Sequence, residues 1–395
     1  MSITCKGTLL AAVCFLAGCV SAPLPGDAFV NTSDPKLIGT RVRDQVLWQC
    51  RFGLAALRAG EHEEAKARFD DAIRTLGGIH ADTADARRAR SLWAAEGGKI
   101  FIGEPYERAL AYAYRGLLYW MDGEPDNARA CFRSAEMMDA LAADAEYRAD
   151  WVLPDYLAGL ASLRLGGDAT EELARARAMT SRPLPDYDRE ARVLVVAEWG
   201  RGPLKFADGP HGQLLRFAES VSEAHHAVLR VAGQTVTLTP WDDVYFQATT
   251  RGGRTMDFIL GDKAVFKDTT GAVGDAALVG ALIAADRAAY RGSEGSAHTA
   301  LALAAAGIFS KVLSASANAT ADTRTWDNLP RYLSFAALRL PPGGHAATIT
   351  FLDAHGRELS PGARPLTIRV SDNQQDTLVF LSEHATRREA LRGEN

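Results

Sequence analysis

Two adjacent histidines and two adjacent aspartates are the residues that could supply a metal site. His225 and His226 precede Asp242 and Asp243 in the chain, and zinc takes imidazole and carboxylate ligands. The two histidines stand at the start of an expected strand, however, where successive side chains point to opposite faces. Both rings could not easily bind one ion, so we expect no metal site.

A glycine-rich turn that carries a lysine is the second candidate for chemistry. Residues 200–205 read GRGPLK, and the backbone N–H groups of such a turn can hold a phosphate. The spacing is not that of a P-loop, and no Ser or Thr follows Lys205. A turn at the end of a strand is therefore the favoured interpretation. The chain also lacks the G-x-S-x-G, H-E-x-x-H and C-x-x-C motifs, so we predict no catalytic residue and no cofactor.

A short polar motif, GEPYER at residues 103–108, stands before an apolar helical pattern. Glu104 suits the N-terminal end of a helix and Pro105 suits its first position. Glu107 and Arg108 could instead recognise charges on a partner. The structural cap is favoured because it accounts for each residue type.

A second polar motif, ADTRTW at residues 321–326, combines an acid, a base and an indole. Asp322, Arg324 and Trp326 could form a recognition loop. They could equally form a buried Asp–Arg pair covered by the tryptophan, which would lock a helix pair onto a sheet. The second interpretation is favoured because regular structure resumes at Leu329 and Pro330, directly after the motif.

Helical repeats are the elements that must position these groups. Residues 101–140 read as two helices joined by the turn DGEP. Small residues at Gly116 and Ala128 let the two helices approach closely while aromatic rings fill the gaps, and the same pattern recurs around Gly53. A weaker third unit covers residues 156–179 and lacks the aromatic. The pattern is that of tetratricopeptide repeats, which stack into a solenoid.

The sequence pattern changes from helical to strand-like after residues 181–190, a proline-containing linker. Short runs rich in valine follow, with a hairpin signal at Ala232-Gly233 and two Ala-rich helices within residues 276–317. The fold class is therefore α+β. It combines a tetratricopeptide-like helical solenoid over residues 37–180 with a mixed domain of antiparallel β-sheet and an Ala-rich helical hairpin over residues 191–382. The expected strands are residues 193–197, 227–231, 234–239, 244–248, 256–260, 333–340, 346–352, 366–370 and 377–381, and residues 383–395 form a polar tail.

The N-terminus reads as an export signal. Residues 1–18 carry Lys6 and then a short apolar run, and the sequence LAGC that ends at Cys19 resembles the bacterial lipobox. The resemblance implies a lipid on Cys19, a tether over residues 19–36, and a place on the periplasmic face of the outer membrane. A membrane partner through that lipid is thus expected, and a net charge of −5 without a basic stripe argues against nucleic acid.

Two cysteines remain outside the signal and the lipobox. Cys50 and Cys131 could pair in an oxidising compartment. Both stand in expected helices, and the favoured interpretation is that each is a small buried apolar residue.

The whole chain resembles an uncharacterised group of bacterial lipoproteins with tetratricopeptide-like N-terminal repeats. The resemblance rests on the lipobox at Cys19, on residues 103–108, on residues 200–205, and on residues 321–326 with the Leu-Pro that follows. It implies work in the cell envelope and assigns no catalytic residue.

The resulting expectation is a non-catalytic scaffold whose concave helical face binds another cell-envelope protein. The expected contacts are Glu107, Arg115, Tyr119 and Trp120. The alternative is an enzyme or ligand-binding protein that acts on cell-wall material through the C-terminal domain. A structural subunit that self-associates is a third possibility.

Overall fold

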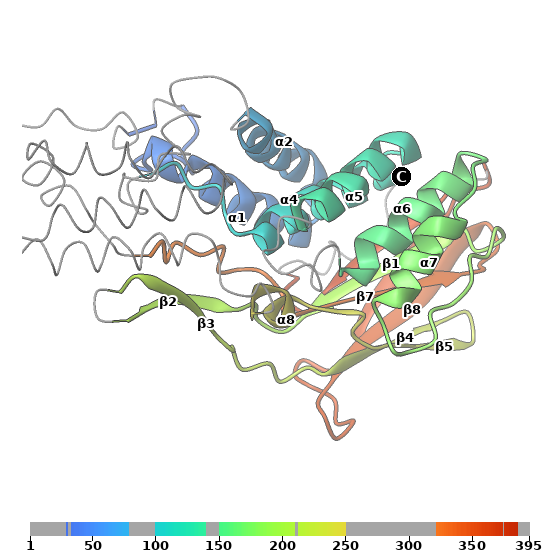
Figure 1. Cartoon of the computed structure of the whole chain (residues 1–395). Coiled ribbons are helices and arrows are strands. Elements are labelled where there is room, and N and C mark those ends of the chain that lie inside the picture. The colour runs from blue at the N-terminus through green and yellow to red at the C-terminus, as the bar shows by residue number, and fades with distance from the viewer. Residues whose placement is uncertain are drawn as a thin grey trace, which may run out of the picture.

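The computed structural model describes residues 29–30, 33–78, 99–139, 150–209, 212–249, 321–373 and 375–385. Over these residues the fold is α+β, as expected, with helices on one side of two four-stranded sheets (Figure 1). Several expected features lie outside the described residues: the signal peptide, Cys19, the strand at 256–260 and the Ala-rich hairpin within 276–317.

Within the described residues, the helical layer consists of three pairs of consecutive helices. They are α1 (Gln45–Arg58) with α2 (His62–Gly78), α4 (Pro105–Met121) with α5 (Pro125–Asp139), and α6 (Val152–Arg164) with α7 (Thr170–Ala178), after a short η2 (Val42–Asp44). A Cβ on Gly53 would stand 3.1 Å from the Phe69 ring, and one on Gly116 would stand 2.6 Å from the Phe132 ring. The recurring glycine therefore admits an aromatic ring of the paired helix. In the third pair, the aromatic side chain that lies against the glycine, Gly159, is Tyr187, which follows α7 in the chain.

The inner sheet lies next to the helices and has the strand order β10-β1-β7-β6. Its strands are β10 (Thr377–Ser382), β1 (Val193–Trp199), β7 (Tyr332–Leu338) and β6 (Asp242–Asp243). The sheet is mixed, because β1 pairs with β10 in parallel and with β7 antiparallel. Successive β1 residues, such as Leu194 and Val195, join cores on opposite faces of the sheet. This two-sided burial explains why β1 is almost continuously apolar.

The outer sheet has the order β5-β4-β8-β9 and is antiparallel throughout. Its strands are β5 (Gln234–Leu238), β4 (His226–Val231), β8 (Gly343–Leu352) and β9 (Arg364–Val370). The expected hairpin is confirmed: Ala232 and Gly233 have φ of 49° and 76° between β4 and β5. Positive φ at both central residues is the requirement of a type I′ turn, whose twist matches that of the strands.

Two elements differ from the expectation. A separate hairpin of β2 (Leu204–Asp208) and β3 (Leu214–Ala218) follows the inner strand β1. Residues 244–248, expected as a strand, belong to the helix α8 (Val244–Thr249). The Asp243 carboxylate accepts a hydrogen bond of 2.9 Å from the Tyr245 N–H and so caps this helix. Within the described part of the chain, no helix has the length and apolarity needed to cross a membrane.

The helices pack directly on the inner sheet, and one hydrophobic core continues from helices to strands. Tyr114 of α4 meets Phe380 of β10 edge to face, and Tyr156 of α6 stacks on Phe335 of β7 with ring centroids 4.3 Å apart. The face presented by α1, α4 and α6 is thus covered by this chain's own sheet. Our expectation that a partner would fill that concave face is corrected by this packing.

Candidate functional site

The motif at residues 103–108 builds the start of α4. Gly103 has φ of 72°, Pro105 opens the helix, and Glu104 with Glu107 forms a capping box. The Glu104 N–H donates to Glu107 Oε2 at 2.7 Å, and Arg108 donates to the Gly103 carbonyl at 2.7 Å. The predicted cap is confirmed.

Glu107 also joins the other two motifs of the family resemblance. Its Oε2 lies 2.5 Å from Lys205 Nζ, and its Oε1 accepts a 2.9 Å hydrogen bond from the Trp326 N–H. The side chains of Glu107 and Lys205 are each only 2% exposed. Three stretches far apart in sequence therefore meet at one buried carboxylate, which we call the Glu107 junction (Glu107, Lys205 and Trp326). The Lys205 ammonium is buried in this ion pair with Glu107, so the turn at residues 200–205 does not present it to a phosphate.

Arg324 extends this junction towards the start of α1. Its guanidinium forms hydrogen bonds of 2.9 and 2.7 Å to Asp322, one of 2.7 Å to Asp44 and one of 3.0 Å to the Lys99 carbonyl. The Phe101 ring lies 5.4 Å from the guanidinium carbon. The favoured Asp–Arg interpretation is thus correct about the pair. The described partners of the pair are the start of α1 and the segment before α4, whereas the Ala-rich helices that the pair was expected to lock lie outside the described residues.

Trp326 is buried rather than offered to a ligand. It is 1% exposed, and its ring lies 6.2 Å from those of both Phe69 and Tyr114. A recognition loop made of Asp322, Arg324 and Trp326 is therefore corrected to an internal brace between the helices and the segment before β7.

A second buried carboxylate, Glu198 on β1, ties the helices to the inner sheet. It is fully buried, and its Oε1 lies 2.5 Å from Arg58 Nε of α1. It also accepts hydrogen bonds from Tyr114 Oη at 2.5 Å and from Ser382 Oγ at 2.7 Å. We call this set the Glu198 junction. We did not single it out from the sequence, where the only signal is one acid in the apolar run VLVVAEW.

Asp242, the acid considered for a metal, caps a helix instead. Its two carboxylate oxygens accept 2.8 Å hydrogen bonds from the Val152 and Leu153 N–H groups at the start of α6. Burial raises the pKa of Asp242 to about 7, against the lowering effect of these two donors. Among the described residues, no group of three or more His, Cys, Asp or Glu could hold a metal ion.

A pair of acids lies between the last three helices. Burial, with Asp155 of α6 beside it, raises the pKa of Glu136 of α5 to about 8. Burial also raises the pKa of Asp155, although Arg175 of α7 lies 2.9 Å from Asp155 and 3.6 Å from Glu136. One base between two acids leaves a proton on the pair at neutral pH.

The four residues expected to contact a partner divide into two classes. Glu107 and Trp120 are each 2% exposed and Arg115 is 6% exposed, so burial corrects the assignment of these three as surface contacts and leaves Tyr119 partly exposed. Arg115 and Tyr119 lie together, with the guanidinium carbon 3.5 Å from the ring centroid. Asp70 of α2 holds Arg115 through bonds of 2.7 and 3.2 Å. We call Asp70, Arg115 and the half-buried Tyr119 the Arg115 platform.

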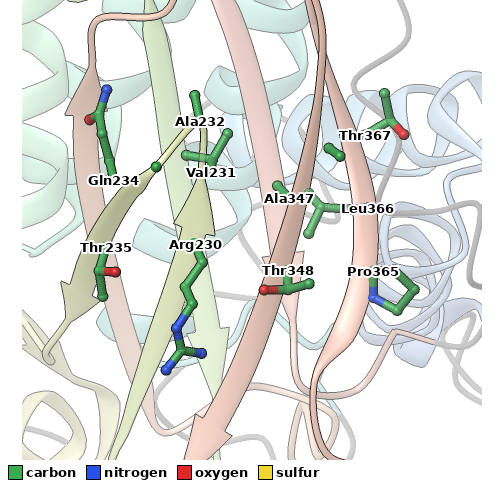
Figure 2. A pocket seen from close by; sticks show the side chains of 12 residues that line it. Arg230, Val231, Ala232, Gln234, Thr235, Ala347, Thr348, Pro365, Leu366 and Thr367 are labelled. Carbon is green, nitrogen blue, oxygen red and sulfur yellow. The ribbon is translucent and has the colours of Figure 1, made fainter.

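The outer sheet carries a hollow of about 840 Å³ on the face that points away from the helices (Figure 2). Arg230 of β4, Thr348 of β8 and Thr367 of β9 contribute polar side chains to it. We did not foresee this site, because its residues come from all four strands of the outer sheet. We call it the sheet hollow.

Both cysteines within the described residues are free, with Cys50 buried and Cys131 partly exposed. Burial raises the pKa of the Cys131 thiol to about 11 and that of Cys50 further, which makes both thiols poor nucleophiles. Comparison of the chain with protein-family models, with curated proteins and with solved structures finds no match. The choice of a site therefore depends on the geometry described above.

Proposed function

We propose that the protein is a lipid-anchored scaffold at the periplasmic face of the outer membrane, where it binds another cell-envelope protein through its helical repeats. The lipid on Cys19 supplies the membrane attachment. The helix pairs form a short tetratricopeptide-like solenoid, a proposal supported by the repeated glycine–phenylalanine contacts at Gly53 and Gly116.

The Arg115 platform is the observation that carries this proposal. The inner face of the helices is filled by the sheet, so a partner must use a surface that remains accessible. Tyr119 keeps part of its ring accessible, and Arg115 stacks on it while paired with Asp70. An aromatic side chain held in place by an ion pair loses little conformational freedom when it binds. Tyr is also one of the residues that dominate many interfaces.

Site-specific photocrosslinking in cells tests this proposal. A photoreactive phenylalanine replaces Tyr119 in the full lipidated chain, and we expect one discrete adduct. The control replaces Arg357, whose side chain is 75% exposed on the loop after β8. The proposal is wrong if Tyr119 gives no adduct, or if both positions give the same one.

Two further variants test the lipid anchor and the partner contact separately. Cys19→Ser should release the protein from the membrane fraction, and retention there would contradict the lipid anchor. Asp70→Asn should weaken the Tyr119 adduct without moving the protein between fractions, because it removes only the ion pair that holds Arg115.

The second candidate function is a ligand-binding protein that acts on cell-wall material through the C-terminal strands. The sheet hollow favours it, because it gathers polar side chains from four strands on one accessible face. A catalytic role would need a nucleophile or a pair of acids there, and none of the hollow's twelve lining residues is acidic.

A further inference from the structure

The sheet hollow has three kinds of polar side chain in its lining: one arginine (Arg230), one glutamine (Gln234) and three threonines. It lies over the outer face of β5, β4, β8 and β9 (Figure 2). Ala232, Gly233 and Ala346 stand at one end of it, where their small size leaves room above the strands. Val231, Ala347 and Leu366, whose side chains join the core on the other face of the sheet, also belong to the lining.

One row of side chains crosses the whole outer sheet in register. Thr235 pairs with Arg230, Arg230 with Thr348, and Thr348 with Pro365. Residues paired across strands have side chains on the same face. Arg230 therefore stands between two threonine hydroxyls, with a third supplied by Thr367 from the next row of β9.

The Arg230 side chain has no ion pair or hydrogen bond with any other residue of the described part of the chain, and it is exposed. Its guanidinium carries five N–H donors that suit a carboxylate. None of the twelve lining residues carries a negative charge to neutralise it. The hollow thus offers one cation and several hydroxyls without a countercharge of its own.

We propose that the sheet hollow binds an extended acidic peptide segment, with Arg230 taking a carboxylate and Thr348 and Thr367 hydrogen-bonding the chain beside it. Four strands span about 14 Å, which is the length of roughly four extended residues. Sugar rings and bases are disfavoured because no lining residue is aromatic, and stacking on aromatic side chains is how such rings are commonly held.

This inference rests on the second candidate function. It is independent of the Arg115 platform, because the hollow faces away from the helices. Loss of the Tyr119 adduct would leave peptide binding intact, and loss of peptide binding would leave the adduct intact.

Fluorescence anisotropy on the purified chain tests the proposal. The probe is a short labelled peptide of alternating glutamate and alanine, and the matched probe has glutamine in place of glutamate. We expect binding of the acidic peptide only, weakening as salt rises. Arg230→Gln should weaken that binding about tenfold, because it removes a charged hydrogen bond. Thr348→Val should weaken it about threefold, because it removes a neutral one.

Arg201→Gln is the matched control. Arg201 is exposed in the loop after β1 and lies outside the hollow, so the variant changes net charge equally and should bind the acidic peptide as the wild type does. Equal binding by the Arg230 variant, equal loss in the Arg201 variant, or equal binding of the glutamine peptide would overturn the proposal. Far-ultraviolet circular dichroism of each variant verifies that the sheet has formed.

Discussion

Buried carboxylates are accommodated differently at the two ends of the helical layer: by pairing with a cation at one end and by keeping a proton at the other. At the end formed by α1 and α4, Glu198 faces Arg58, and Glu107 likewise faces a buried cation. At the end formed by α5, α6 and α7, Glu136 lies beside another acid, Asp155, and its pKa rises to about 8. Charge pairing therefore joins helices to strands at the first end, while a retained proton helps join helix to helix at the second.

This difference shows where each end is sensitive. A buried ion pair contributes little net stability, but removing one partner leaves an uncompensated charge in a poorly solvated place. A pair of acids that keeps a proton responds instead to pH. Mutations should therefore act most strongly at the first end, and pH should act most strongly at the second.

The largest expected effect comes from Arg58→Met. The change keeps the volume of the side chain but leaves Glu198 buried with only Tyr114 and Ser382 as donors. We expect the free energy of unfolding to fall by about 3–5 kcal/mol. The measurement is the midpoint and slope of urea unfolding, which together separate lost stability from a changed unfolded state.

Arg339→Met is the control for this prediction. Arg339 pairs with Asp188, and their side chains are 66% and 34% exposed, so the loss should be at most about 1 kcal/mol. Adding Glu198→Leu to Arg58→Met should recover part of the stability. Similar losses at the buried and the exposed pair would contradict the importance given to the Glu198 junction.

Glu107→Gln should have the next largest effect. The amide is nearly isosteric, but it leaves the Lys205 ammonium buried without an anion. We expect a loss of about 2–3 kcal/mol, again from urea unfolding. Glu63→Gln is the comparison, because Glu63 is 89% exposed in its pair with Lys66. A loss no larger than that of the Glu63 variant would show that the three motifs do not depend on this carboxylate.

Local sequence patterns predicted the helices and strands of this fold better than they predicted the contacts between these elements. The spacing of Gly116 and the aromatic residues after it was enough to predict a helix pair, because close approach requires a missing Cβ. The turn at Ala232-Gly233 was equally local. By contrast, residues 244–248 look like a strand, but in the structure they form α8, whose start is capped by the Asp243 side chain.

The site could not be predicted in the same way, because its geometry depends on tertiary contacts. The three motifs that meet at Glu107 were each visible, but their meeting depends on how β2 and the segment before β7 pack on α4. The burial of Glu107 and Trp120 follows from the sheet that covers the helices. The sheet hollow needs the register of four strands, which no single stretch encodes.

Glu136→Gln tests the second end of the helical layer through pH. In the unfolded chain, Glu and Asp have pKa values of about 4.3 and 3.9. In the folded chain the pKa of Glu136 is about 8 and that of Asp155 is also raised. The folded state thus holds more protons between these limits, so the stability that the pair contributes is complete below about pH 4 and is lost as pH rises through about 8.

The glutamine variant should therefore match the wild type near pH 4 and exceed it near pH 9, by on the order of 1–3 kcal/mol. The measured quantity is the difference between the two unfolding curves at each pH. Asp242, whose pKa is about 7, should make stability depend on pH in a similar way. Because it is present in both proteins, its contribution cancels in this difference. Glu171→Gln, on the exposed side of α7, should leave the wild-type slope unchanged. Parallel curves for wild type and Glu136→Gln would mean that the acids at this end do not keep a proton, and the contrast between the two ends would disappear.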